Sequence, residues 1–305
     1  MNGTTEVDQM WGLSIAMVVV AAATLAVLVW RGCLRANAMA DGPRRDVGLQ
    51  WWDLPTALLV MVLGMLAFGG VGAQVFELEP GTTRPAGGIR AQAAWVLLSQ
   101  LIGQGVVLAY VMWRTAAAVH GWRRFGLVPT RPTRDAWMSL LGLAAALPLV
   151  VGTLSLMSMI GEWVGMPAPA VGHELLDELL RSDDAVGLAM MIVAVVVVGP
   201  FFEELIFRGV VQTSLMSVLG AARRWLVVVI AAVVFALIHV GAGTFDPEGV
   251  GGVPWHALPG LAVLGVVLGW LYEKTGSLWP AVVVHGGFNA FNVAMVLAMQ
   301  RWEWL

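Results

Sequence analysis

The chain has 305 residues, of which 59% are hydrophobic and only 12% are charged. Soluble domains carry about 25% charged residues, so this composition indicates a membrane protein. The net charge of −3 gives no reason to expect a nucleic-acid partner. The single cysteine, Cys33, excludes an intramolecular disulfide and a cysteine-cluster zinc site.

Apolar runs long enough to cross a bilayer recur along the whole chain. A transmembrane helix needs roughly 20 apolar residues to span about 30 Å of hydrocarbon. Runs of about this length predict eight helices, at residues 11–30, 54–76, 91–113, 136–161, 185–202, 225–245, 249–272 and 275–300. The first run is too long for a signal peptide and follows acidic residues, so we expect no cleavage there. The predicted fold class is therefore an all-α polytopic membrane protein, a bundle of about eight transmembrane helices.

The charges between these helices predict an orientation, because basic residues favour the cytoplasmic side. Basic residues follow every odd-numbered predicted helix: Arg31, Arg35, Arg44, Arg45, Arg114, Arg123, Arg124, Arg131, Arg134, Arg208, Arg223, Arg224 and Lys274. The alternate loops, among them the acidic loop 161–184, are neutral or acidic. We therefore predict both termini outside. The composition, rich in Ala, Val, Gly and Arg with little Lys, favours a bacterial inner membrane.

Three charged residues interrupt the apolar stretch "VVVVGPFFEELIFRGVVQ", residues 195–212. Each ionised side chain costs roughly 2.5–3.5 kcal/mol at the centre of a membrane helix. Glu204 and Arg208 are four residues apart and can pair on one helical face, whereas Glu203 points about 100° away. The alternative is a helix that ends here with its charges in water. The sequence after Arg208 continues mostly apolar, which favours a helix that does not stop.

Two histidines also lie inside apolar runs, His239 and His285. His285, Asn289 and Asn292 follow helical spacing, so one face carries an imidazole and two amides. Buried polar groups require partners, and these groups and Glu203 are the obvious partners for one another. We interpret the remaining histidines as surface or interfacial residues: His120, His173 and His256.

These side chains together favour hydrolysis. A carboxylate withdrawn from water is a stronger general base, so Glu203 could activate a water that attacks a carbonyl. One histidine would hold that water, and Asn289 with the other histidine would face the oxyanion. Glu203, His239 and His285 could alternatively hold zinc with an open coordination position. The serine motif G-x-S-x-G does not occur, and "HELLD" at residues 173–177 lacks the second histidine of a zinc motif.

Three motifs in order resemble the CAAX-protease and bacteriocin-processing family of intramembrane endopeptidases, also called the ABI family. Its pattern E-E-x-x-x-R, F-x-x-x-H and H-x-x-x-N stands here at residues 203–208, 235–239 and 285–289. The segment "FGLVP" at 125–129 is also similar to the family. We therefore expect three accessory transmembrane helices in residues 1–120. The protease core would occupy residues 121–305 of the same membrane domain.

The resemblance implies a role for each motif residue. Glu203 would be the base, His239 would share its water, and His285 with Asn289 would form the oxyanion site. Glu204 and Arg208 would support them, with Arg208 also a candidate for substrate contact. The implied partner is a membrane protein or peptide, prenylated in eukaryotic members of the family. The family leaves a metal cofactor such as zinc open, and the sequence predicts no oligomeric state.

Two questions stay open at this level. If the charged helix ended near Arg208, His239 would lie deeper than its partners, at roughly 21 Å along an ideal helix from Trp225. Either the helix of His239 starts late, or the charged helix continues to the basic pair at 223–224; we favour the second. The rival functions are a secondary transporter, for which no matching broken helix appears in the first half, and a catalytically silent scaffold.

Overall fold

The structure is a computed structural model. It describes residues 3–43, 48–77, 87–116, 123, 125–129, 131–166, 184–239 and 255–301. Every regular element within these ranges is helical, which confirms the predicted all-α class. Seven stretches in them are long and apolar enough to cross a membrane.

The first four of these stretches are α1 (Gly3–Trp30), α2 (Asp53–Val75), a compound helix and α6 (Pro132–Trp163). The compound helix joins α3 (Gly88–Leu98), the π-helical η1 (Ser99–Gln104) and α4 (Gly105–Ala116). The fifth stretch, Ala185–Leu219, joins α8 (Ala185–Val193), η2 (Ala194–Val198), α9 (Gly199–Glu204), η3 (Leu205–Gln212) and α10 (Thr213–Leu219). The short η4 (Ala221–Arg223) leads to α11 (Arg224–Ile238). The last helices are α12 (Leu258–Thr275), after the short η5 (Trp255–Ala257), and α13 (Trp279–Arg301).

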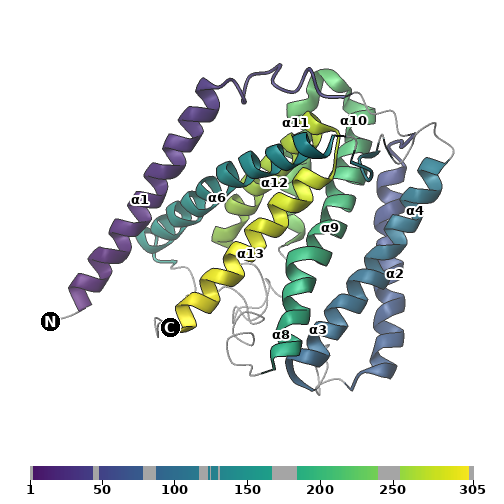
Figure 1. The fold of residues 1–305 in the computed structure, drawn as a ribbon, viewed down its shortest axis with the longest axis horizontal. Helices are drawn as coiled ribbons and strands as arrows, with labels where there is room; N and C mark the ends of the chain where they lie inside the picture. Colours follow the sequence, from purple (N-terminus) through teal and green to yellow (C-terminus); the bar gives the residue numbers. More distant parts are fainter. Residues whose placement is uncertain are drawn as a thin grey trace.

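The helix α12 corresponds to the seventh predicted helix, residues 249–272, although it is not among the seven long apolar stretches. It lies inside the bundle and packs against α6, α11 and α13 (Figure 1). Its buried residues include Leu264, Leu268 and Leu271. Since neighbouring helices cover it, α12 needs less apolar surface of its own than a helix that faces lipid.

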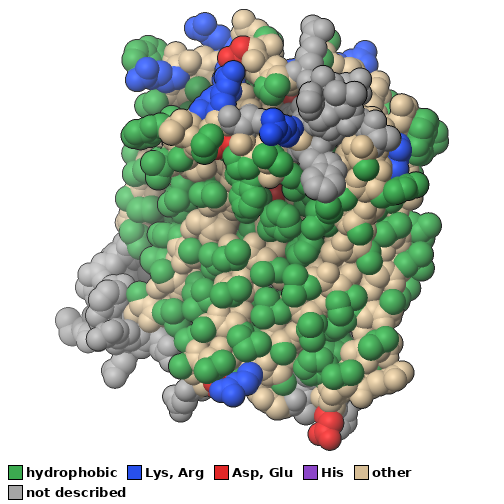
Figure 2. All heavy atoms as spheres, turned by 45° about the vertical axis from the view of Figure 1, so that its right-hand side comes forward, with side chains coloured by type: hydrophobic (Ala, Val, Ile, Leu, Met, Phe, Trp, Pro, Cys, Tyr) green, Lys and Arg blue, Asp and Glu red, His purple; other side chains and the backbone are tan. Residues whose placement is uncertain are grey.

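The outer surface of the bundle is apolar around its middle. Figure 2 shows hydrophobic side chains over the central part of this face, with charged side chains gathered toward the two ends. Large apolar residues such as Leu63, Val71 and Trp113 are exposed. A soluble monomer rarely exposes so much apolar surface, and lipid is its natural solvent. The chain is an integral membrane protein.

The two chain ends lie at the same end of the bundle, whereas the segment after α1 lies at the other (Figure 1). At that opposite end, charged side chains bind the segment after α1 to α11 and α12. Arg224 donates to the carbonyl oxygens of Met39 and Gly42, and Lys274 Nζ lies 2.6 Å from Asp41 Oδ1. The hydrogen bond from Lys274 holds the pKa of the Asp41 carboxyl below its usual value. Which side of the membrane this end faces stays a prediction.

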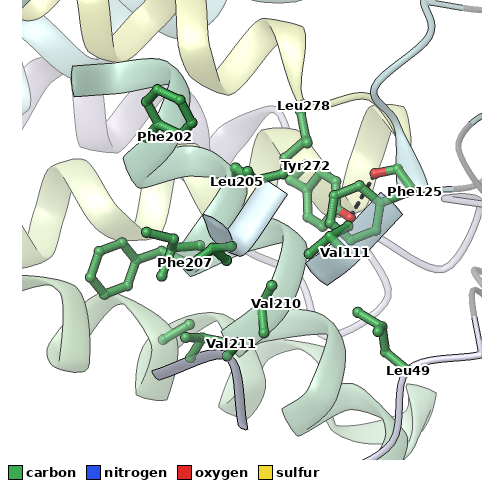
Figure 3. Close-up of a cluster of buried hydrophobic side chains, with 14 of the residues drawn as sticks. Leu49, Val111, Phe125, Phe202, Leu205, Phe207, Val210, Val211, Tyr272 and Leu278 are labelled. Carbon is green, nitrogen blue, oxygen red and sulfur yellow. Dashed lines mark hydrogen bonds between the residues drawn. The ribbon is translucent and has the colours of Figure 1, made fainter. Parts of the chain in front are cut away.

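A buried apolar cluster links the fifth membrane stretch to the N-terminal helices (Figure 3). It includes Leu205 and Val210 of η3, Tyr272 of α12 and Val111 of α4. Tyr272 donates its hydroxyl hydrogen to the carbonyl oxygen of Phe125, at 3.0 Å. The second and third of the helices predicted to be accessory therefore pack directly against the helix that carries the charges, whereas α1 packs against α6.

The helix boundaries resolve one of the open questions. The charged helix continues beyond Arg208 to Leu219, as we favoured. The next helix starts at Arg224 and ends at Ile238, shorter than the predicted 225–245. Residues 240–254, with the Gly-rich segment 241–252, lie outside the described residues, as do His120, His173 and most of the acidic loop 161–184.

Candidate active site

The backbone around the paired glutamates departs from a regular α-helix. Glu203 and Glu204 end α9, a short α-helical piece between the π-helical segments η2 and η3. A π-helix inserts an extra residue into a turn, leaves backbone groups without their usual partners and is frequent at functional sites. These π-helical segments were not predicted from the sequence.

Glu204 and Arg208 form the predicted ion pair, and both are buried. Arg208 Nη1 donates to Glu204 Oε1 at 3.1 Å, and Arg208 Nε lies 3.1 Å from Glu204 Oε2. Arg208 Nη2 donates to the carbonyl oxygen of Gly265, and its guanidinium lies 4.8 Å from the ring centre of Phe235. With a side chain only 1% exposed, Arg208 is placed to support Glu204 rather than to meet a substrate.

The contact between Glu204 and His285 fixes one imidazole. His285 Nδ1 lies 2.9 Å from Glu204 Oε1. Because an ionised carboxylate only accepts hydrogen bonds, Nδ1 carries the hydrogen and donates it. In neutral His285 the lone pair is then on Nε2, which lies 3.8 Å from Glu203 Oε2.

His239 is fixed in the same way by a backbone carbonyl. It caps the C-terminus of α11, and its Nδ1 lies 2.7 Å from the carbonyl oxygen of Phe235. A carbonyl oxygen also only accepts, so the lone pair of neutral His239 is again on Nε2. That atom lies 3.6 Å from the same oxygen, Glu203 Oε2.

Three hydrogen-bond acceptors therefore face one another. Glu203 Oε2 is buried and has no hydrogen-bond partner within the described part of the chain. Its distances to the two Nε2 atoms, 3.6 and 3.8 Å, are too long for direct hydrogen bonds. A donor between them, such as water, would satisfy all three. The side chains of Glu203 and His239 are each 26% exposed, so the group is not sealed.

Asn289, the remaining predicted site residue, has a different partner. Its Nδ2 donates to the carbonyl oxygen of Val195 in η2, at 2.9 Å. The structure therefore groups Glu203, His239 and His285, with Glu204 and Arg208 behind them, and sets the Asn289 amide nitrogen against η2. Asn292, predicted on the same face, is exposed.

Gly286 permits the approach of α13 to η2. A Cβ built on Gly286 would lie 2.4 Å from the carbonyl oxygen of Val196. We expect Gly286→Ala to push the two helices apart and to destabilise the protein by about 1–3 kcal/mol. A thermal unfolding series in detergent would measure this. The matched control is Gly287→Ala, whose Cβ would meet only the flexible end of Leu143, at 3.1 Å. Equal stability of the two variants would contradict this view of the contact.

A buried polar chain extends from the ion pair along α12. Gln212 Nε2 donates to the carbonyl oxygen of Gly269 at 3.1 Å and to Glu273 Oε1 at 2.9 Å. Glu273 Oε2 lies 3.7 Å from Arg224 Nε. Sequence reasoning missed Gln212 and Glu273. The regular spacing of Glu204, Arg208 and Gln212, four residues apart, was the available signal.

The predicted metal site combines a suitable donor set with unsuitable geometry. Two imidazoles and one carboxylate are the ligands of several catalytic zinc sites. Yet no group of three His, Cys, Asp or Glu side chains among the residues that the structure describes is arranged to hold a metal ion. We therefore derive no chemical step through a metal. His256 lies apart in η5, where burial lowers the pKa of its imidazole.

These observations define a polytopic helical membrane protein with a partly exposed glutamate–histidine group between three helices. Residues 185–291 match the family model described as type II CAAX prenyl endopeptidase Rce1-like, which confirms over that segment the family that the motifs resembled. The segment contains all six predicted site residues, and the match supports a protease. No curated protein and no solved structure gives a significant match to the chain.

Proposed function

We propose that the protein is an intramembrane endopeptidase that hydrolyses a peptide bond with a water molecule activated by Glu203. One observation carries this proposal: Glu203 Oε2 is buried, lacks a hydrogen-bond partner in the described structure and lies opposite two imidazole nitrogens. The family match agrees with it, since the model describes endopeptidases.

In the proposed reaction, water occupies the space between the three acceptors. It donates one hydrogen to Glu203 Oε2 and the other to His239 Nε2, which orients its lone pair toward the substrate carbonyl. As the oxygen attacks, Glu203 takes the proton and later delivers it to the leaving amine. This transfer balances the reaction: the peptide bond breaks, the water supplies the O–H of the new carboxylic acid, and its other hydrogen, carried by Glu203, goes to the new amine.

His285 is placed to stabilise the tetrahedral oxyanion. In its neutral form His285 is an acceptor at Nε2, so it would donate to the oxyanion only after taking up a proton at that atom, while its Nδ1–H stays bound to Glu204. Arg208 in turn forms an ion pair with the same Glu204 carboxylate. Asn289 Nδ2 donates one hydrogen to the carbonyl oxygen of Val195 and has a second, so its amide could also donate to the oxyanion, but the mechanism does not depend on it.

The substrate we propose is a membrane-associated protein or peptide. The described family acts on prenylated CAAX ends, whereas the composition favours a bacterium, in which prenylation is not expected. Two probes separate these cases: a fluorogenic farnesylated CAAX peptide and an unlipidated membrane-spanning peptide. We further propose that the end fastened by Arg224 and Lys274 faces the cytoplasm, with the protein in the bacterial inner membrane.

We expect cleavage to survive removal of divalent metals, because the proposed steps use only water and side chains. The measurement is the initial rate on either probe before and after dialysis against a chelator, with thermal stability followed in the same samples. Loss of activity that zinc restores, with unchanged stability, would replace the metal-free mechanism by one in which Glu203, His239 and His285 bind the ion.

A further inference from the structure

Two glutamines of the N-terminal helices lie in a π-helix that contacts the helix with the glutamates. Gln100 and Gln104 lie in η1, four residues apart and close to one face of it. The π-helix η1 contacts α9. The Oε1 atoms of both side chains are buried and have no hydrogen-bond partner among the described residues. Neither glutamine belongs to a motif that suggested the family.

Gly199 brings Gln100 next to the proposed base. A Cβ built on Gly199 would lie 3.0 Å from Gln100 Nε2 and 3.7 Å from Glu203 Oε1. Gly199 and Glu203 are four residues apart on α9, about one turn, so they share a face. Because Gly199 has no side chain, the Gln100 carboxamide reaches the face of α9 on which the Glu203 carboxylate lies.

A buried acceptor without a partner lowers stability, so its retention calls for a ligand that satisfies it. A carboxamide offers an acceptor oxygen and two donor hydrogens, which match the N–H and C=O of a peptide group. An extended peptide that presents its main chain would therefore satisfy Gln100. The other carboxamide near the site, Asn289, already donates to Val195.

We propose that Gln100 binds the main chain of the peptide substrate beside the bond that is cleaved. The N-terminal helices thereby contribute a substrate-binding residue to a site whose other members all lie in residues 185–291. This inference rests on the proposed function, and the experiment below has separate arms for the two.

The first arm uses the purified full chain and the two peptide probes. We expect Gln100→Leu to lower kcat/KM about three- to tenfold, mainly through KM, which corresponds to one lost hydrogen bond. The melting temperature should stay equal or rise, because the variant removes a buried polar group that lacks a partner. Leu101→Ala, on the lipid-exposed side of the same π-helix, is the matched control and should behave as the parent.

The second arm locates the contact. Probes with single backbone N–H groups replaced by ester oxygens should lose kcat/KM with the parent at one position near the cleaved bond. With Gln100→Leu that same replacement should cause no further loss. The proposal would be overturned if Gln100→Leu kept the kcat/KM of the parent. It would also be overturned if parent and variant lost kcat/KM equally at every ester position.

The third arm is peptide binding to the Glu203→Gln protein, measured by fluorescence anisotropy with and without Gln100→Leu. This arm distinguishes a failure of the proposed endopeptidase function from a failure of the proposed role of Gln100. If the parent cleaves neither probe, the proposed function fails, and binding still decides the role of Gln100. A Kd that rises three- to tenfold with Gln100→Leu supports it, and an unchanged Kd overturns it.

Discussion

Glu203→Gln should reduce cleavage by about 10²–10⁴-fold while the protein folds normally. The variant keeps the shape of the side chain and removes the carboxylate that would take the proton from water. Its fold should survive, because Glu203 Oε2 has no hydrogen-bond partner in the described structure to lose. The rate constants on both probes measure the loss of cleavage, and the melting temperature in detergent measures whether the fold is intact.

Two further variants are needed to interpret this result, a control and a test of His239. Glu77→Gln, at an exposed position, is the matched control and should cleave as the parent does. His239→Ala should also lower kcat strongly, because the water would lose one of its two orienting acceptors. Parental activity of both Glu203→Gln and His239→Ala would show that the assigned chemistry is wrong.

Glu204→Gln should act first on folding. The substitution leaves the Arg208 guanidinium buried without its counter-charge, which costs about 3–5 kcal/mol when one partner of a buried pair is removed. It also weakens the acceptor for His285 Nδ1. We expect a large loss of folded protein after membrane extraction, measured by size-exclusion chromatography of the detergent-solubilised protein.

The double variant Glu204→Gln with Arg208→Met separates charge from packing. It removes the unpaired cation together with its partner, so the folded yield should recover at least in part. Activity should stay low, because His285 would have lost its ionised neighbour. A normal yield of Glu204→Gln alone, with cleavage abolished, would instead place Glu204 among the groups that take part in the reaction.

The helix pattern and the ion pair followed from the sequence. The length of apolar runs fixes where a chain can cross a bilayer, and four-residue spacing fixes which charges share a face; for this reason the helix order and the contact of Glu204 with Arg208 were predictable. The continuation of the charged helix to Leu219 was also anticipated from the apolar sequence after Arg208.

What escaped prediction depends on contacts between distant segments. Nothing local distinguishes Gln100 from other polar residues in apolar runs, and for Gln212 the four-residue spacing from Arg208 gave no indication of its contact with Glu273. The π-helical segments likewise depend on packing that residue spacing does not predict. The hydrogen bond from Asn289 to the carbonyl oxygen of Val195 was also not predicted, and the role of Asn289 at the oxyanion stays a prediction.

The hydrogen bonds from Arg208 and Gln212 to α12 end on the carbonyl oxygens of Gly265 and Gly269. Trimming side chains one by one along α12 cannot delete these two acceptors, so an alanine scan that skips glycines would pass over the contact. Adding a methyl group is the informative change: at Gly269 it would come within 2.8 Å of Gln212 Oε1. The tolerance of these two glycine positions to mutation should therefore be set by the bulk that a substitution adds rather than by a side-chain interaction that it removes.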